Sequence, residues 1–71
     1  MTAYLEGYKE IKLLLSKNIN PDVDLEKVSL LNHDDIKFKL IDKYFHDNKW
    51  HVYLESNKNL DPHLDYVVCI N

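Results

Sequence analysis

The sequence contains very little glycine and no arginine, and both shortages exclude classes of function. Glycine provides the positive φ angles and close backbone approaches that phosphate-binding loops, dinucleotide turns and serine nucleophile elbows require. Here Gly7 is the single glycine. Arginine binds phosphates, carboxylates and guanine edges in a bidentate manner, but every cation of this chain is a lysine or a histidine. The composition therefore disfavours nucleotide-dependent catalysis, acyl transfer and the reading of DNA bases.

Cysteine and long apolar runs are scarce as well. One cysteine, Cys69, excludes an internal disulfide and a zinc site built from paired cysteines. The apolar runs are too short to span a membrane, and the N-terminus lacks the basic and apolar regions of a signal peptide. We therefore expect a cytoplasmic protein with no membrane partner.

What the chain does contain is enough apolar material for one compact domain over residues 1–71. Hydrophobic residues make up 45% of the sequence, which argues against disorder. A chain of 71 residues buries only about 60% of its unfolded surface, so a second copy or a partner would add stability. The net charge of −3 is mild, but acidic residues crowd one stretch. They are Asp22, Asp24, Glu26, Asp34 and Asp35.

The N-terminal segment matches a helical pattern. Tyr4, Tyr8, Ile11 and Leu15 recur at i, i+4, i+7 and i+11, which predicts an amphipathic helix over residues 3–17. Gly7 lies inside this segment, where close packing against a neighbouring element would explain it.

Residues 36–46 fit both a helix and a strand, and the interpretation of function depends on which one forms. Residues 49–56 alternate clearly between apolar and polar side chains, and a turn with Asn48 at positive φ precedes them. A three-residue loop, Asp47–Lys49, would place one set of apolar residues on a single face, so we favour a β-hairpin. The set is Ile36, Phe38, Leu40, Tyr44, Trp50, Val52 and Leu54.

The remaining segments complete two alternative folds. Residues 66–70 are apolar on both faces and predict a final strand, and residues 27–32 predict a short strand that pairs back across residues 32–35. The favoured fold class is α+β, with the N-terminal helix packed on a three- or four-stranded antiparallel sheet. The alternative is a winged helix, with helices at 3–17, 22–31 and 34–47 and a hairpin of 49–56 and 64–70.

Catalytic, cofactor and metal sites are not expected. In the favoured register His46 and His51 lie on opposite faces of the hairpin, which prevents them from sharing a metal ion. Cys69 lies in the most apolar segment, where a thiol is normally an inert core residue. Adjacent carboxylates at Asp34 and Asp35 are typical of turns and caps rather than of acid–base pairs.

Elimination leaves a non-enzymatic module that binds another protein, of an inhibitor, immunity or regulatory kind. Two surfaces are candidates: an aromatic sheet face with Phe45, His51 and Tyr53, and the acidic patch, since tyrosine and tryptophan are favoured anchors of protein interfaces. The acidic patch comprises Asp22, Asp24, Asp34 and Asp35. The alternative function is DNA binding by the winged helix through the lysines of 36–46, which the negative net charge disfavours. Both hypotheses allow a homodimer.

Overall fold

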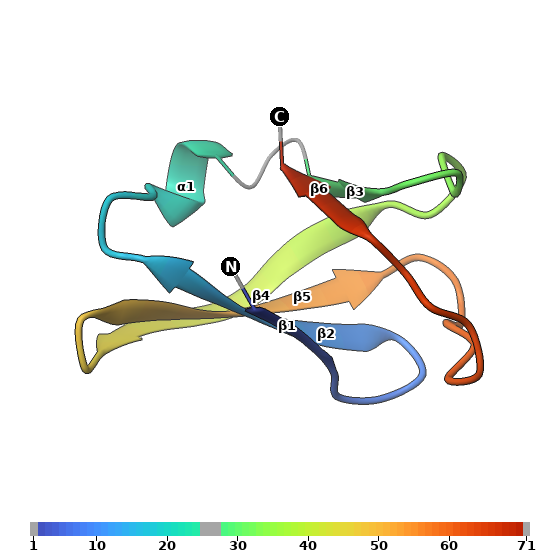
Figure 1. The fold of residues 1–71 in the computed structure, drawn as a ribbon, viewed down its shortest axis with the longest axis horizontal. Helices are drawn as coiled ribbons and strands as arrows, with labels where there is room; N and C mark the ends of the chain where they lie inside the picture. The colour runs from blue at the N-terminus through green and yellow to red at the C-terminus, as the bar shows by residue number, and fades with distance from the viewer. Residues whose placement is uncertain (1, 25–27, 71) are drawn as a thin grey trace.

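Two antiparallel sheets and one helical turn make up the fold in the computed structural model, which describes residues 2–24 and 28–70 (Figure 1). The larger sheet has four strands in the order β1-β2-β5-β4, and the smaller one pairs β3 with β6. The elements are β1 (Thr2–Leu5), β2 (Glu10–Ser16), α1 (Pro21–Asp24), β3 (Val28–Leu30), β4 (Phe38–His46), β5 (Lys49–Ser56) and β6 (Val68–Ile70).

The N-terminal segment is a β-hairpin, so the predicted helix over residues 3–17 is wrong. β1 and β2 pair antiparallel with Leu5 opposite Ile11. The side chains of Ile11, Leu13 and Leu15 are buried at alternate positions, whereas Tyr8 of the helical pattern is 71% exposed. Three alternating buried residues stabilise a strand between two neighbours more than the helical pattern stabilises an isolated helix. The α+β prediction therefore gives way to a fold that is nearly all sheet.

Gly7 lies in the bend between these two strands and not at a packed contact. The backbone N–H groups of Glu6 and Gly7 both donate to the carbonyl oxygen of Glu10, at 2.9 and 3.3 Å. A Cβ built on Gly7 would meet no atom within 4 Å. The predicted close packing of this glycine is therefore also wrong, and its place is explained by the turn.

The β4–β5 hairpin confirms the strand prediction for residues 36–46 and overturns the winged helix, which required a helix there. The turn has two residues, not the expected three: His46 pairs with Lys49, and Asp47 and Asn48 have φ angles of 54° and 62°. Positive φ at both central positions is the type I′ geometry, whose twist matches that of the flanking strands.

The predicted set of apolar residues on one face of this hairpin is partly wrong, because β4 contains a β-bulge. The register shifts between Leu40 and Asp42, so that Tyr44 pairs with His51 while Leu40 still pairs with Leu54. Phe38 and Leu40 therefore lie on the same face as Leu54, as predicted, but Tyr44 lies on the opposite face. One extra residue in β4 reverses the face of every side chain between the bulge and the turn.

The smaller sheet and α1 lie on one side of the four-stranded sheet and cover that face (Figure 1). β3 pairs with β6, with Leu30 opposite Val68, rather than with residues beyond the turn at 32–35. Of the predicted strand 27–32, Lys27 lies outside the described residues. The core forms between the two layers. Its buried members are Ile11, Leu13, Leu15, Val28, Leu30, Ile36, Val52, Leu54 and Leu60.

Candidate binding surface

The uncovered face of the four-stranded sheet carries aromatic and polar side chains in two rows across the strands. One row runs Tyr4, Lys12, Tyr53 and Asp42 from β1 to β4, and the next runs Thr2, Leu14, His51 and Tyr44. Directly opposite residues of antiparallel strands share a face, so both rows point away from the core. We call six of these residues the outer face: Tyr4, Lys12, Leu14, Tyr44, His51 and Tyr53.

The aromatic rings of the outer face stack on one another. Tyr44 and His51 lie parallel, with ring centroids 4.6 Å apart and an interplanar angle of 6°. Tyr44 also approaches Tyr53, at 6.3 Å between centroids. Because neighbouring side chains on the sheet turn their ring faces toward each other, the ring edges are left to point outward. A surface that presents ring edges and hydroxyl groups offers hydrogen bonds and apolar contact together.

Lys12 places a positive charge among these rings. Its Nζ lies 5.5 Å from the centroid of the Tyr53 ring, within the range of a cation–π interaction. A hydrogen bond with Tyr53 is the largest cause that raises the pKa of Lys12. Burial opposes it with a smaller effect, and the charges of Tyr53, Tyr44 and Glu6 each raise this pKa by less again. The ammonium therefore remains charged at neutral pH.

No ion pair among the described residues involves Lys12. The ion pairs there join Lys39 to Glu55, Lys43 to Asp22 and Lys58 to Asp35. A side-chain hydrogen bond with Tyr53 is the largest cause that raises the pKa of Tyr44, and burial raises it further, whereas the charge of Lys12 lowers it. The centre of the outer face thus combines a cation that forms no ion pair among the described residues with the phenol groups of Tyr44 and Tyr53.

His51 is the member of the outer face with an unsatisfied polar atom. Its Nδ1 is buried and has no hydrogen-bond partner among the described residues. His46 lies beside it, with ring centroids 6.0 Å apart, so the two histidines share a face, contrary to the prediction that they lie on opposite faces. No group of three or more metal-ligating side chains occurs in residues 2–24 and 28–70.

The structure separates the three aromatic residues that the sequence grouped together. His51 and Tyr53 lie on the outer face, whereas Phe45 pairs with Trp50 on the opposite face and meets its ring edge-on, at 5.3 Å between centroids. Tyr4, Lys12 and Leu14 join the outer face because their segment forms strands. The signal that could have revealed them is the alternation of Ile11, Leu13 and Leu15 with the residues between them.

The predicted acidic patch is divided among separate contacts. Asp22 of α1 forms an ion pair with Lys43 of β4, and Asp34 is exposed in a turn. The side chain of Asp24 and the whole of Glu26 lie outside the described part of the structure. At least one carboxylate of the stretch is therefore bound to a lysine of the adjacent sheet.

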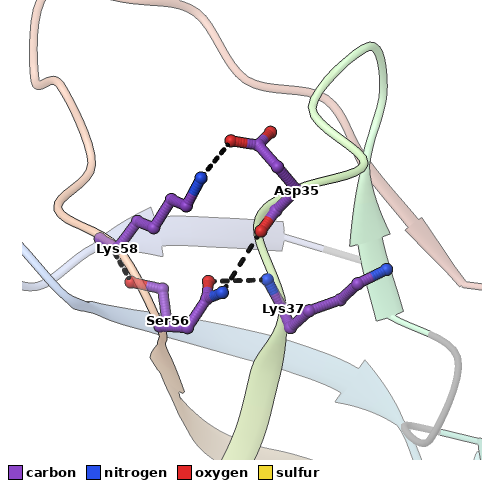
Figure 2. A network of polar contacts seen from close by, with 5 residues as sticks. Asp35, Lys37, Ser56 and Lys58 are labelled. Carbon is purple, nitrogen blue, oxygen red and sulfur yellow. Dashed lines mark hydrogen bonds and ion pairs between the residues drawn. The ribbon is translucent and has the colours of Figure 1, made fainter.

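Asp35 belongs to a polar network that joins two loops (Figure 2). Its Oδ2 accepts a hydrogen bond from Lys58 Nζ at 2.7 Å, and its carbonyl oxygen accepts one from Asn57 Nδ2 at 3.2 Å. Asn57 also accepts from the backbone N–H of Lys37 at 2.8 Å, while buried Ser56 donates to the carbonyl of Lys58 at 2.6 Å. Lys58 holds the pKa of Asp35 below its ordinary value, and this carboxylate serves a structural contact.

The two edge strands of the large sheet differ in how their backbones are protected. β4 is interrupted by the bulge, the Asp42 carboxylate accepts a hydrogen bond from the Lys43 N–H at 2.9 Å, and the Lys43 side chain points inward to Asp22. Bulges and inward charges are devices that prevent an edge strand from pairing with another chain. β1, at the other edge, has neither device.

Comparisons of the chain with protein-family models, curated proteins and solved structures found no match. No helix within the described ranges is both long and apolar enough to cross a lipid bilayer.

Proposed function

We propose that this protein is a small, non-enzymatic interaction module that binds another protein through its outer face. The observation that carries the proposal is the cluster of tyrosines and a histidine beside Lys12, whose ammonium forms no ion pair among the described residues. Tyrosine is enriched at the centres of protein interfaces because it buries a large area at little cost in conformational entropy. An inhibitor, immunity or regulatory module in the cytoplasm fits these properties, as the sequence led us to expect.

The charges around the cluster favour a protein over a nucleic acid. Asp42 stands opposite Tyr53, and Glu10 stands opposite Glu55 on the same face. Phosphates laid along this face would pass close to carboxylates at both positions and lose much of the attraction of the lysines.

The orientation of the rings favours a protein as well. Single-stranded nucleic acids bind through bases that stack on open aromatic faces. Here the ring faces of Tyr44 and His51 are directed at each other, at an angle of 6°. The outer face offers ring edges and hydroxyl groups, which suit the mixed polar and apolar surface of a protein.

The chemistry of the outer face specifies what the partner should present. Lys12 calls for a carboxylate, and the hydroxyls of Tyr4 and Tyr53 offer hydrogen bonds beside it. Leu14 and the ring of Tyr44, which is about two-fifths exposed, offer apolar contact next to this polar centre. We therefore expect the partner to dock an acidic side chain that is flanked by apolar or aromatic residues.

Site-directed photocrosslinking in cells that express the protein tests the proposal. A benzophenone amino acid replaces Tyr53 in one variant and Lys37, which lies ahead of β4, in a control variant. We expect a protein adduct specific to position 53, which mass spectrometry can identify. The purified partner should then bind Lys12→Glu at least about tenfold more weakly than the original protein, because removal of a central contact costs more than about 1 kcal/mol.

A matched charge reversal, Lys37→Glu, should leave the affinity for that partner unchanged. Absence of a specific adduct at position 53, or an equal affinity of Lys12→Glu and Lys37→Glu, would overturn the proposal. An adduct with RNA or DNA at position 53 would also overturn it and assign the face to nucleic-acid binding.

A further inference from the structure

β1 presents backbone groups that form no hydrogen bond with any other described segment. The hydrogen bond from the Glu6 N–H to the Glu10 carbonyl shows which residues of β1 direct their backbone groups toward β2, since such residues alternate along a strand. By that alternation the N–H and C=O groups of Ala3 and Leu5 point away from β2. Among the described residues, no hydrogen bond outside this ladder involves Ala3 or Leu5. The free edge can therefore donate two hydrogen bonds and accept two.

An apolar groove runs beside this edge, between β1 and the layer that covers the sheet. It has a volume of about 220 Å³, and its apolar lining includes Leu5, Ile11, Leu30, Leu60 and Val68. A second hollow of about 240 Å³ shares Leu5 and Pro62 with the first and continues past the end of β1. The side chains of Ala3 and Leu5 line the groove, so backbone donors and an apolar trough lie next to each other.

The charged residues that line the two hollows are all acidic. Asp65 lines the first and Glu6 lines the second, and none of the lysines that the structure describes lines either one. Neither carboxylate takes part in the ion pairs that join the described residues. A segment that binds here gains most if it carries cationic side chains at its ends and apolar ones between them.

We infer that β1 binds an extended, lysine- or arginine-flanked apolar segment of a partner protein, which adds to the sheet as a fifth strand. Backbone hydrogen bonds to Ala3 and Leu5 would supply affinity, and alternate apolar side chains would enter the groove. The cationic ends of the segment would lie near Glu6 and Asp65. The groove shares Tyr4 with the outer face, but the inference rests on the backbone groups of Ala3 and Leu5 and does not depend on the proposed function.

A second copy of this chain fits the edge less well than such a segment. Its own unprotected strand, β1, consists of Thr-Ala-Tyr-Leu and carries no cation. Its other edge strand, β4, contains lysines but is interrupted by the bulge and the Lys43–Asp22 pair. Charge complementarity therefore favours a basic segment of a different protein.

The test uses a library of capped pentapeptides with lysine at both ends and Val, Ile, Leu or Phe between them. The intact protein is titrated with each peptide and followed by two-dimensional NMR and amide hydrogen exchange. We expect at least one peptide to bind with a Kd below about 1 mM. Binding should shift and protect the amides of Ala3 and Leu5. The same peptides with N-methylated backbones should lose this binding, because they cannot complete the ladder.

Two variants make the result specific. Asp65→Lys should weaken the best lysine-flanked peptide by about tenfold or more and favour its glutamate-flanked counterpart. Lys37→Glu, at a residue that lines neither hollow, should leave the affinity for the peptide unchanged. Because the test reads the amides of Ala3 and Leu5, its failure and failure of the proposed function are distinguishable. Absence of shifts at Ala3 and Leu5 for the whole library would overturn the inference. So would shifts confined to the outer face, or equal binding of the glutamate-flanked peptides.

Discussion

Tyr44 and His51 stack face to face across the β4–β5 hairpin, with ring centroids 4.6 Å apart and planes inclined by 6°. The pair depends on a two-residue turn and a bulge. The turn sets His46 opposite Lys49, and therefore Tyr44 opposite His51, while the bulge allows Leu40 to pair with Leu54 on the core face. The stack fixes the position of both rings on the outer face. It therefore links the register of the hairpin to the composition of the candidate binding surface.

Replacement of the two stacked residues should reveal an interaction energy between them. We expect the double variant Tyr44→Ala/His51→Ala to be less destabilised than the sum of the single variants, by about 0.5–1 kcal/mol. Urea unfolding followed by circular dichroism measures the four free energies of the cycle. In a control cycle His51 is combined with Lys39, whose partner is Glu55. The free energies of the two single variants should add up to that of the double variant, because these residues do not contact each other. Additivity in the Tyr44–His51 cycle would contradict a stabilising stack.

The turn residue Asn48 should respond in opposite directions to two small substitutions. Its φ angle of 62° is favourable for glycine and strained for a residue with an ordinary side chain. We expect Asn48→Gly to keep or raise the free energy of unfolding and Asn48→Ala to lower it by about 1 kcal/mol. Thermal and urea unfolding of both variants test this. Equal stability of the two variants would show that the left-handed turn conformation does not form.

The β4–β5 hairpin could be predicted from the sequence because its signals agree. Trp50, Val52 and Leu54 alternate with polar residues, and Asp47 and Asn48 both tolerate positive φ. The length of the turn and the bulge could not be predicted from the sequence. A turn one residue shorter than expected and one extra residue at Ile41 have opposite effects, so Leu40 still shares a face with Leu54. The apolar spacing therefore predicts the correct face of the sheet for Leu40 and the wrong one for Tyr44.

Periodicity alone does not decide between strand and helix in the N-terminal segment, because its residues satisfy both patterns at once. Ile11 and Leu15 are four residues apart, which suits a helix, and both also belong to the alternating set with Leu13. Tertiary contact decides between the patterns: β5 offers Leu54, Val52 and Trp50 opposite these three positions. Because the segment was expected to be helical, the sequence did not predict that Tyr4, Lys12 and Leu14 belong to the candidate surface.

Gly7 offers a direct test of the corrected fold. A Cβ at this position meets no atom within 4 Å, and no glycine of the described residues has a positive φ. Gly7→Ala should therefore be tolerated and should raise the free energy of unfolding by about 0.4–1 kcal/mol, because alanine restricts the unfolded chain. Differential scanning calorimetry of the variant measures the change. A loss of more than about 1 kcal/mol would instead indicate a close packing contact at this residue.

The Asp35–Lys58 contact predicts how stability depends on pH. The hydrogen bond from Lys58 is the largest cause that lowers the pKa of Asp35 below 3.8, and the second is a hydrogen bond with its own backbone. Because protons bind this carboxyl more weakly in the folded state, its contribution to stability is fully present above the ordinary pKa of an aspartate. That contribution is lost as the pH falls through the lowered value.

Lys58→Gln should therefore raise the pKa of Asp35 toward its ordinary value, as followed by carboxyl NMR titration. The variant should also flatten the decline of the urea midpoint below pH 4, while Lys39→Gln, whose partner is Glu55, should leave the Asp35 titration unchanged. If the Asp35 pKa stays low in Lys58→Gln, the backbone hydrogen bond is its main cause. The connection between the two loops would then depend on Asn57, which hydrogen-bonds both the Asp35 carbonyl and the Lys37 N–H.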